Sequence, residues 1–117
     1  MPRITSEVHV AAPPERVMAV ARAVERFPEF IPDVQRIVVE ERSPDGDRVV
    51  VSWEAAIPEF KVTVRWTEED RWDAAQRRCD FRQVRGDFAQ YGGYWAFHPA
   101  DGGTRFESVV DYEIEIP

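Results

Sequence analysis

The chain has 117 residues, 44% of them hydrophobic and 32% charged, and its formal net charge is −7. This length predicts a single domain, residues 1–117, with one hydrophobic core. No run of the sequence approaches the roughly 20 apolar residues that a membrane-spanning helix needs, so we expect no stable membrane insertion. The excess of acidic residues disfavours binding to nucleic acid, whose phosphates attract Lys and Arg.

Other features of the composition indicate the cellular compartment. The N-terminus, MPRITSEVHV, lacks the long apolar region of a secretory signal. The one cysteine, Cys79, cannot form an internal disulfide. We therefore expect a cytoplasmic protein. Four arginines cluster at positions 77–85, but Asp80 lies among them, and we expect a solvated strand face there and no nucleic-acid partner.

Helical periodicity is confined to one segment near the N-terminus. Residues 4–10 alternate between apolar and polar, which predicts a strand with one buried face. Pro13 and its neighbours have the composition of a helix start, and apolar residues recur at helical spacing over 17–24. Because proline disfavours helical geometry in the residue before it, Pro28 is expected to end this helix at Phe27.

The remainder of the chain alternates with a period of two, which predicts six further strands. We expect these strands at 35–42, 49–57, 62–66, 78–83, 91–97 and 106–116. The turn sequences are SPDGD at 43–47, WDAAQ at 72–76 and ADGG at 100–103, and Gly86 with Asp87 interrupts one strand. The predicted fold class is α+β: a curved, seven-stranded antiparallel sheet with one solvated face and short N-terminal helices.

The inward face of this sheet carries many large side chains. They are Trp53, Trp66, Phe81, Trp95, Phe97, Phe106 and Tyr112. One short helix cannot cover such a face, and an uncovered aromatic face would exceed the apolar patches usual on monomers. We therefore expect a further helix after Pro117 in the natural protein, or else a homodimer formed through the uncovered face.

The segment FPEFIPDV, residues 27–34, is unusually apolar for a connection between a helix and a strand. Its two prolines limit it to one or two helical turns, which place Phe27, Phe30 and Ile31 on one side. These three residues either cap the core or roof the mouth of a cavity at the end of the sheet. The spacing alone leaves both alternatives open.

Two long stretches resemble a known family. APPERVMAVARAVERFPEFIPDV, followed by a sheet and then FRQVRGDFAQYGGYWAFHPADGGTRFE, is similar to the START-like or SRPBCC "helix-grip" superfamily. The nearest likeness is to polyketide cyclase/dehydrase-type and coenzyme Q-binding-type single-domain proteins. The resemblance implies a sheet that grips a long C-terminal helix, absent from this chain, around a lipophilic cavity. It also implies that Phe27, Phe30 and Ile31 belong to a lid.

Aromatase/cyclases of this superfamily are thought to use a pocket arginine, a nearby hydroxyl and a tyrosine. The resemblance carries these onto Glu69, Thr67 and Val34, so only the hydroxyl is kept. This departure weakens the cyclase interpretation and favours a binding protein.

The residues themselves give little sign of catalysis. His9 and His98 lie on the polar sides of their strands with no third ligand nearby, so we expect neither a metal nor a cofactor. Cys79 lies among inward apolar residues and is expected to be a buried small hydrophobe. Gln83 and Ser108 are inward polar residues, which either bond to a neighbouring strand or orient a ligand. No catalytic residue is assigned.

We predict a protein that binds a lipophilic small molecule, such as a quinone, a polyketide or a lipid. The alternative is a polyketide aromatase/cyclase or dehydratase-type enzyme, which would need a titratable group with a shifted pKa inside the cavity. A third class, protein binding like that of the ribosome-association toxins, is disfavoured by the acidic charge. The expected ligand-contacting residues are Phe27, Phe30, Ile31, Trp53, Trp66, Thr67, Phe81, Gln83, Trp95, Phe97, Ser108 and Tyr112.

Overall fold

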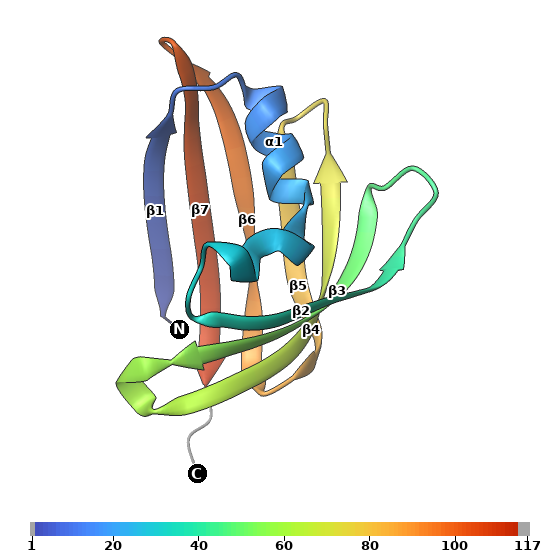
Figure 1. Cartoon of the computed structure of the whole chain (residues 1–117), viewed down its shortest axis with the longest axis vertical. Coiled ribbons are helices and arrows are strands. Elements are labelled where there is room, and N and C mark those ends of the chain that lie inside the picture. The colour runs from blue at the N-terminus through green and yellow to red at the C-terminus, as the bar shows by residue number, and fades with distance from the viewer. Residues whose placement is uncertain (1, 115–117) are drawn as a thin grey trace.

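The computed structural model describes residues 2–114, which form one curved antiparallel sheet with helical segments on its inner side (Figure 1). The strand order is β1-β7-β6-β5-β4-β3-β2, and every neighbouring pair is antiparallel. The strands are β1 (Arg3–Val10), β2 (Val34–Arg42), β3 (Arg48–Ile57), β4 (Val62–Asp73), β5 (Arg78–Gly86), β6 (Phe88–Ala100) and β7 (Gly103–Ile114). The predicted α+β meander is confirmed.

Most strands are longer than their alternation predicted. β4 in particular continues to Asp73, so the first two residues of the expected turn at 72–76 belong to the strand. The chain reverses over the next four residues, where the side chain of Asp73 accepts a hydrogen bond from the backbone of Gln76. Residues 115 and 116 of the predicted last strand lie outside the described residues.

The predicted single helix is divided into two pieces. α1 (Pro14–Arg22) ends at Arg22, and a 3-10 helix, η1 (Val24–Glu29), follows. The expectation that Pro28 ends an α-helix at Phe27 is therefore wrong, since Pro28 lies inside η1. Both pieces pack on the same sheet, so apolar residues keep their helical spacing across the break. The sequence pattern therefore gives no sign of the break.

The two helical pieces cover different parts of the sheet. α1 packs on β6 and β7, and η1 packs on β2, as Figure 1 shows. Neither piece covers β1, where Ile4 and Val8 are 54% and 55% exposed. The predicted buried face of that strand is thus wrong for the described residues, because β1 is an edge strand beyond the reach of α1.

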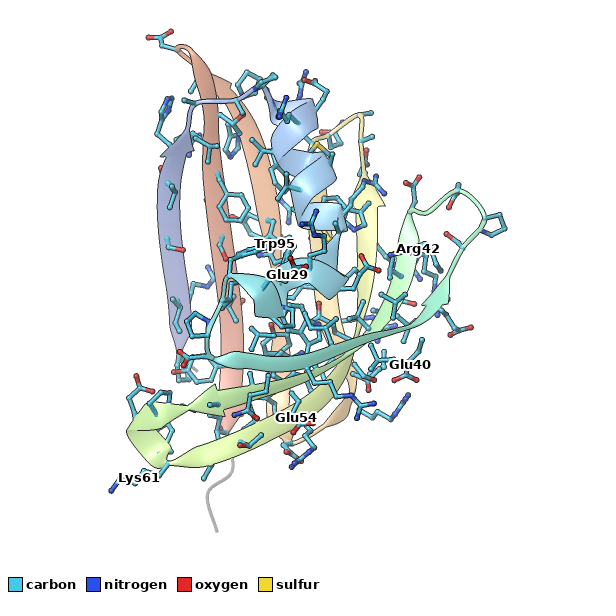
Figure 2. All side chains as sticks on the ribbon, in the orientation of Figure 1. Glu29, Glu40, Arg42, Glu54, Lys61 and Trp95 are labelled. Carbon is cyan, nitrogen blue, oxygen red and sulfur yellow. The ribbon has the colours of Figure 1, made fainter. Side chains whose placement is uncertain are left out.

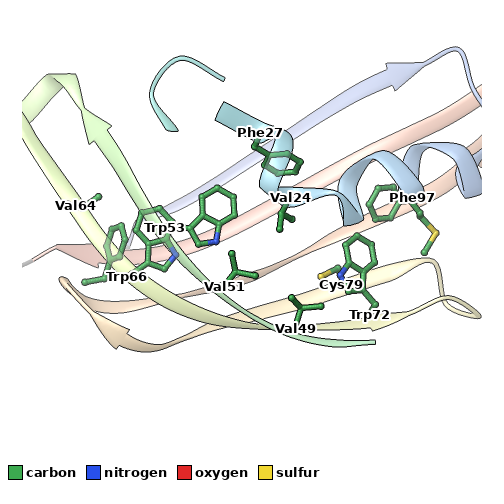
Figure 3. Packing of buried hydrophobic residues seen from close by; sticks show 12 residues of the cluster. Val24, Phe27, Val49, Val51, Trp53, Val64, Trp66, Trp72, Cys79 and Phe97 are labelled. Atoms are coloured by element: carbon green, nitrogen blue, oxygen red, sulfur yellow. The ribbon is translucent and has the colours of Figure 1, made fainter. Parts of the chain in front are cut away.

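The hydrophobic core lies between η1 and strands β3 to β6. Figure 3 shows Val24 and Phe27 of η1 above Trp53 and Val51 of β3, with Trp66 beside Trp53. Val51, Cys79 and Phe97 are almost completely buried. The core thus holds the 3-10 helix over the aromatic part of the sheet, where a ligand site is expected.

Candidate ligand-binding site

An open apolar groove of about 510 Å³ lies between α1, η1 and the sheet. Its lining includes Val17, Val20, Phe27, Phe30, Ile31, Trp95, Phe97 and Phe106. Phe30 is 59% exposed and stands at the rim, whereas Phe27 is buried. The three residues of the predicted lid therefore do lie together along one hollow.

A second, deeper cavity of about 240 Å³ adjoins this groove. The two hollows share Phe27, Ile31 and Trp95, so these residues form the boundary between them. Figure 2 shows Trp95 on the side of the sheet where η1 lies. The other walls of the deeper cavity are Val34, Trp53, Trp66, Glu68, Phe81, Tyr91 and Val110.

Aromatic contacts connect the lid to the walls. The Phe27 ring lies 5.9 Å from the Trp53 ring and 6.1 Å from the Trp95 ring, measured between centroids. Trp53 in turn stacks on Trp66 at 5.5 Å with only 7° between the ring planes. Such contacts fix the orientation of the indole rings that line the deeper cavity.

Two carboxyl groups lie beneath these aromatic residues. The alternation of β4 places Trp66, Glu68, Asp70 and Trp72 on the inner face of the sheet. Glu68 is only 3% exposed and lines the deeper cavity, and its neighbour Asp70 is 1% exposed. The Trp66 indole N–H donates a hydrogen bond of 2.9 Å to Glu68 Oε1. Neither carboxyl forms an ion pair with a basic residue within 2–114.

Burial favours one proton on this pair of acids. Burial, followed by the hydrogen bond to Asp70, raises the pKa of Glu68 well above its ordinary value, against the opposing effect of the Trp66 N–H. Burial likewise raises the pKa of Asp70. Asp70 Oδ1 is buried without an N–H or O–H donor in the described chain, which is unfavourable for a carboxylate. A proton held between the two carboxyls removes that penalty and leaves one negative charge.

Tyr91 completes the ionisable groups of the cavity. Burial raises the pKa of its phenol well above the ordinary value, and the charges of Glu68 and Asp70 add to the effect. Tyr91 therefore keeps its proton at neutral pH and can only donate or accept a hydrogen bond there.

Eight of the twelve predicted contact residues line the groove or the deeper cavity. They are Phe27, Phe30, Ile31, Trp53, Trp66, Phe81, Trp95 and Phe97. That they contact a ligand stays a prediction. The sequence reading missed Glu68, Asp70 and Tyr91 as members of the site, although the alternation of β4 and β6 was a usable signal for all three.

The remaining four predicted residues lie elsewhere. Thr67 is on the outer face, where its hydroxyl lies 2.8 Å from that of Ser52. The Gln83 amide binds the backbone of Phe88 at 2.9 Å, which closes the turn between β5 and β6. Ser108 is half-buried opposite Trp95, and Tyr112 packs against the core beside Phe88.

The three positions matched to the aromatase/cyclase residues do not lie together in one site. Glu69 lies on the outer face and binds Arg48 at 2.6 Å and Arg71 at 2.9 Å. The hydrogen bond from Arg48 is the main cause that lowers the pKa of this carboxyl. Val34 does line the deeper cavity but carries no hydroxyl. At this level of β4 the inward group is Glu68, one residue before the position that the resemblance indicated.

The clustered arginines are engaged with acids of the surface. Arg77 pairs with Glu15, Arg78 with Asp80, Arg82 with Glu69 and Arg85 with Glu40, at 2.9 to 3.3 Å. Figure 2 shows Glu40 pointing away from the side of the sheet that η1 covers. These pairs support the expectation of a solvated face. Within residues 2–114 no group of His, Cys, Asp and Glu has the arrangement of a metal site.

The expectation that Cys79 is a buried small hydrophobe is confirmed. Burial, with smaller contributions from the charges of Asp70 and Glu68, raises the pKa of its thiol. Because the thiolate is the reactive form, we predict that 5,5′-dithiobis(2-nitrobenzoate) does not react with the folded protein at pH 8 within an hour. In guanidinium chloride one thiol per chain should react at once. Rapid labelling of the folded protein would contradict this placement of Cys79.

Comparison with known proteins identifies the family. The family model "Polyketide cyclase / dehydrase and lipid transport" matches residues 10–117. The chain belongs to this family. The recognition of a START-like member of the polyketide cyclase/dehydrase group is confirmed. Among curated proteins none matches the chain.

Several solved structures share the fold of this chain. TTHA0849 from Thermus thermophilus is 35% identical with a TM-score of 0.91, and the match covers 99% of this chain and 77% of that one. The ZhuI aromatase/cyclase from Streptomyces sp. R1128 is 20% identical, with a TM-score of 0.86 and coverage of 99% and 70%. A START superfamily protein from Mycobacterium smegmatis is 18% identical, with a TM-score of 0.84 and coverage of 98% and 79%. No helix in the described chain is long and apolar enough to cross a membrane.

Proposed function

We propose that this member of the polyketide cyclase/dehydrase family binds a lipophilic small molecule in the deeper cavity, which the ligand enters through the apolar groove. The observation that carries the proposal is that the two hollows adjoin at Phe27, Ile31 and Trp95. Pockets for small ligands are mostly apolar with a few polar groups, and these walls have that composition. The family description, which names lipid transport and polyketide chemistry, supports the same class of ligand.

The lid makes entry of a ligand feasible. Phe30 is exposed and contacts Phe27 at 5.6 Å between ring centroids, and η1 is a short 3-10 helix between two non-helical residues. 3-10 helices have poorer hydrogen-bond geometry than α-helices, so rearranging one costs less. A small movement of η1 would open the boundary between groove and cavity.

The substitution Phe30→Asp tests this proposal. N-Phenyl-1-naphthylamine, an uncharged probe that fluoresces in apolar surroundings, should bind the wild-type protein. Because a carboxylate at the rim makes the entrance polar and loses the phenyl contact, Phe30→Asp should weaken probe binding by about tenfold. Fluorescence titration at pH 7.5 gives both dissociation constants.

Phe60→Asp is the matched control. Phe60 is also an exposed phenylalanine, 48% accessible in the 3-10 helix η2 (Pro58–Phe60), but it lines neither hollow. It should change the dissociation constant less than twofold. Equal losses in the two variants, or no probe binding by the wild type, would refute the proposed site.

A second candidate function is proton-transfer catalysis on a polyketide-like ligand. The observation that favours it is Glu68, a titratable group with a raised pKa that lines the cavity. An acid of this kind can donate a proton to a carbonyl or hydroxyl of a bound chain. The discriminating experiment is turnover of a poly-β-ketone substrate: Glu68→Gln should abolish it while probe binding persists. Absence of turnover in the wild type leaves binding as the function.

A further inference from the structure

Trp53, a wall residue of the deeper cavity, has a buried polar group without a partner within residues 2–114. Trp53 is only 9% exposed, and its indole N–H has no hydrogen-bond acceptor in the part of the chain that the structure describes. A buried donor without an acceptor costs free energy that a bound ligand can recover. The N–H of the stacked neighbour Trp66 has its acceptor, Glu68 Oε1 at 2.9 Å, so the two indoles differ in this respect.

The residue with the unpartnered N–H, Trp53, lines the same cavity as Glu68. The Trp53 ring lies 5.5 Å from the Trp66 ring that binds Glu68. The cavity therefore offers, on neighbouring parts of its wall, the indole of Trp53 and a carboxyl of the acid pair, which carries one negative charge in total. Its other walls, apart from the Tyr91 phenol, are hydrocarbon or aromatic.

From this juxtaposition we propose that the cavity selects an uncharged lipophilic ligand bearing a hydroxyl, such as a phenol or an enol, and rejects lipophilic carboxylates. The inference rests on the binding function proposed above and names the chemistry of its ligand. A hydroxyl oxygen accepts the Trp53 N–H bond while its own hydrogen is donated to Glu68. A carboxylate also accepts from Trp53, but it brings a second negative charge beside the acid pair.

The volume of the deeper cavity limits the size of the ligand that it can hold. Its volume of about 240 Å³ is below that of most ligand pockets, which span roughly 300–1,000 Å³. One or two fused rings suit this space, and a longer chain would have to extend into the groove. Ligand hydroxyls attached directly to a ring system thus fit the polar wall better than those at the end of a long chain.

Three naphthalene derivatives of similar shape test the inference by displacing N-phenyl-1-naphthylamine at pH 7.5. 2-Naphthol should bind about tenfold more tightly than 2-methylnaphthalene, because a hydrogen bond to a buried charge is strong. 2-Naphthoate should bind about tenfold more weakly than 2-methylnaphthalene because like charges repel in an apolar site. Equal affinities for 2-naphthol and 2-methylnaphthalene would overturn the inference.

Two variants separate the two polar groups. In the double variant Glu68→Gln/Asp70→Asn the binding of 2-naphthoate should rise about tenfold, since the charge of the acid pair is gone, and the preference for 2-naphthol should fall to about threefold. Trp53→Phe should reduce the preference for 2-naphthol while 2-naphthoate stays rejected. Glu69→Gln is the matched control, because Glu69 lies on the same strand but faces outward, and it should leave all three affinities in their wild-type order.

The outcomes distinguish this inference from the proposed function. If the probe and 2-methylnaphthalene bind but the selectivity is absent, or is unchanged in Glu68→Gln/Asp70→Asn, the hydroxyl inference is wrong and lipophilic binding stands. If neither the probe nor any derivative binds the wild-type protein, both are wrong.

Discussion

Replacing Glu68 with glutamine is expected to stabilise the folded protein at neutral pH, by about 1–2 kcal/mol in the free energy of unfolding. The side chain is buried, and burial with the neighbouring Asp70 raises the pKa of its carboxyl. The amide of the glutamine can donate to Asp70 Oδ1, which has no donor within residues 2–114. Its carbonyl can still accept the hydrogen bond from Trp66. The substitution therefore satisfies each polar atom without a shared proton.

The pH dependence of this effect has a definite sign. The pKa of Glu68 is raised in the folded state, so the folded protein keeps a proton that the unfolded chain releases. Stability of the wild type should therefore fall as pH rises from the ordinary carboxyl pKa, near 4.3, towards the raised one. Below that ordinary pKa both states are protonated and the penalty is absent. The advantage of Glu68→Gln should be largest near pH 8 and should vanish near pH 4.

Urea unfolding of both proteins at several pH values measures this difference. The control is Glu69→Gln, which removes the acceptor of Arg48 and Arg71 on the outer face and should destabilise the protein by about 1 kcal/mol at pH 8. Opposite signs for two neighbouring glutamates on one strand would be hard to explain unless Glu68 faces inward and Glu69 outward. A Glu68→Gln protein less stable than wild type at pH 8 would show that the acid pair is not an unfavourable buried charge.

Gly93→Ala is expected to cause the largest loss of stability, about 3–4 kcal/mol. A Cβ atom on Gly93 would lie 1.9 Å from the backbone oxygen of Val109 on β7. β7 cannot move away easily because it is hydrogen-bonded to β6 on one side and to β1 on the other.

Gly102→Ala provides the comparison for this prediction. Gly102 lies in the turn before β7 with a φ of +73°, and a Cβ there would meet no atom within 4 Å. Its cost should come only from the left-handed backbone, about 1 kcal/mol. Equilibrium unfolding in urea of both variants should separate the two mechanisms. If Gly93→Ala costs no more than Gly102→Ala, β6 and β7 do not approach closely at Gly93.

Much of the sheet was predictable because most strands alternate between an apolar inner face and a charged outer face. Trp53, Trp66 and Trp95 were assigned inward from their spacing alone, and all three line the deeper cavity. The turns at SPDGD and ADGG were also found, since glycines with positive φ, Gly46 and Gly102, occur there. Local chemistry determined these features, so a single sequence was enough.

The acid pair was missed for a physical reason. Three consecutive acids at 68–70 resemble a solvated strand end, and charged side chains are rarely buried without an opposite charge. Extending the alternation from Trp66 to Trp72 would have placed Glu68 and Asp70 inward. The resemblance matched the pocket arginine of the family to Glu69, whereas the inward residue is Glu68, one position earlier. A shift of one residue in a strand moves a side chain to the opposite face.

Other errors came from contacts that no local pattern contains. The break after Arg22 depends on tertiary contacts: its guanidinium stacks on Trp72, 4.7 Å from the ring centroid, and binds the backbone oxygen of Gly46 at 3.1 Å. Thr67 was included as a ligand contact by resemblance, although the alternation placed it opposite Trp66, and the structure agrees with the alternation. Gln83 was correctly placed inward, but its partner is the Phe88 backbone.

The most direct test of ligand binding beside Trp53 is a titration with 2-naphthol, followed in the indole region of a ¹H–¹⁵N correlation spectrum. The chain has four tryptophans and so four indole N–H signals, each assignable by substitution. The Trp53 signal should move downfield as its N–H gains an acceptor, whereas the Trp72 signal, from outside both hollows, should stay in place. A Trp53 signal unchanged at saturating 2-naphthol would contradict the proposed site.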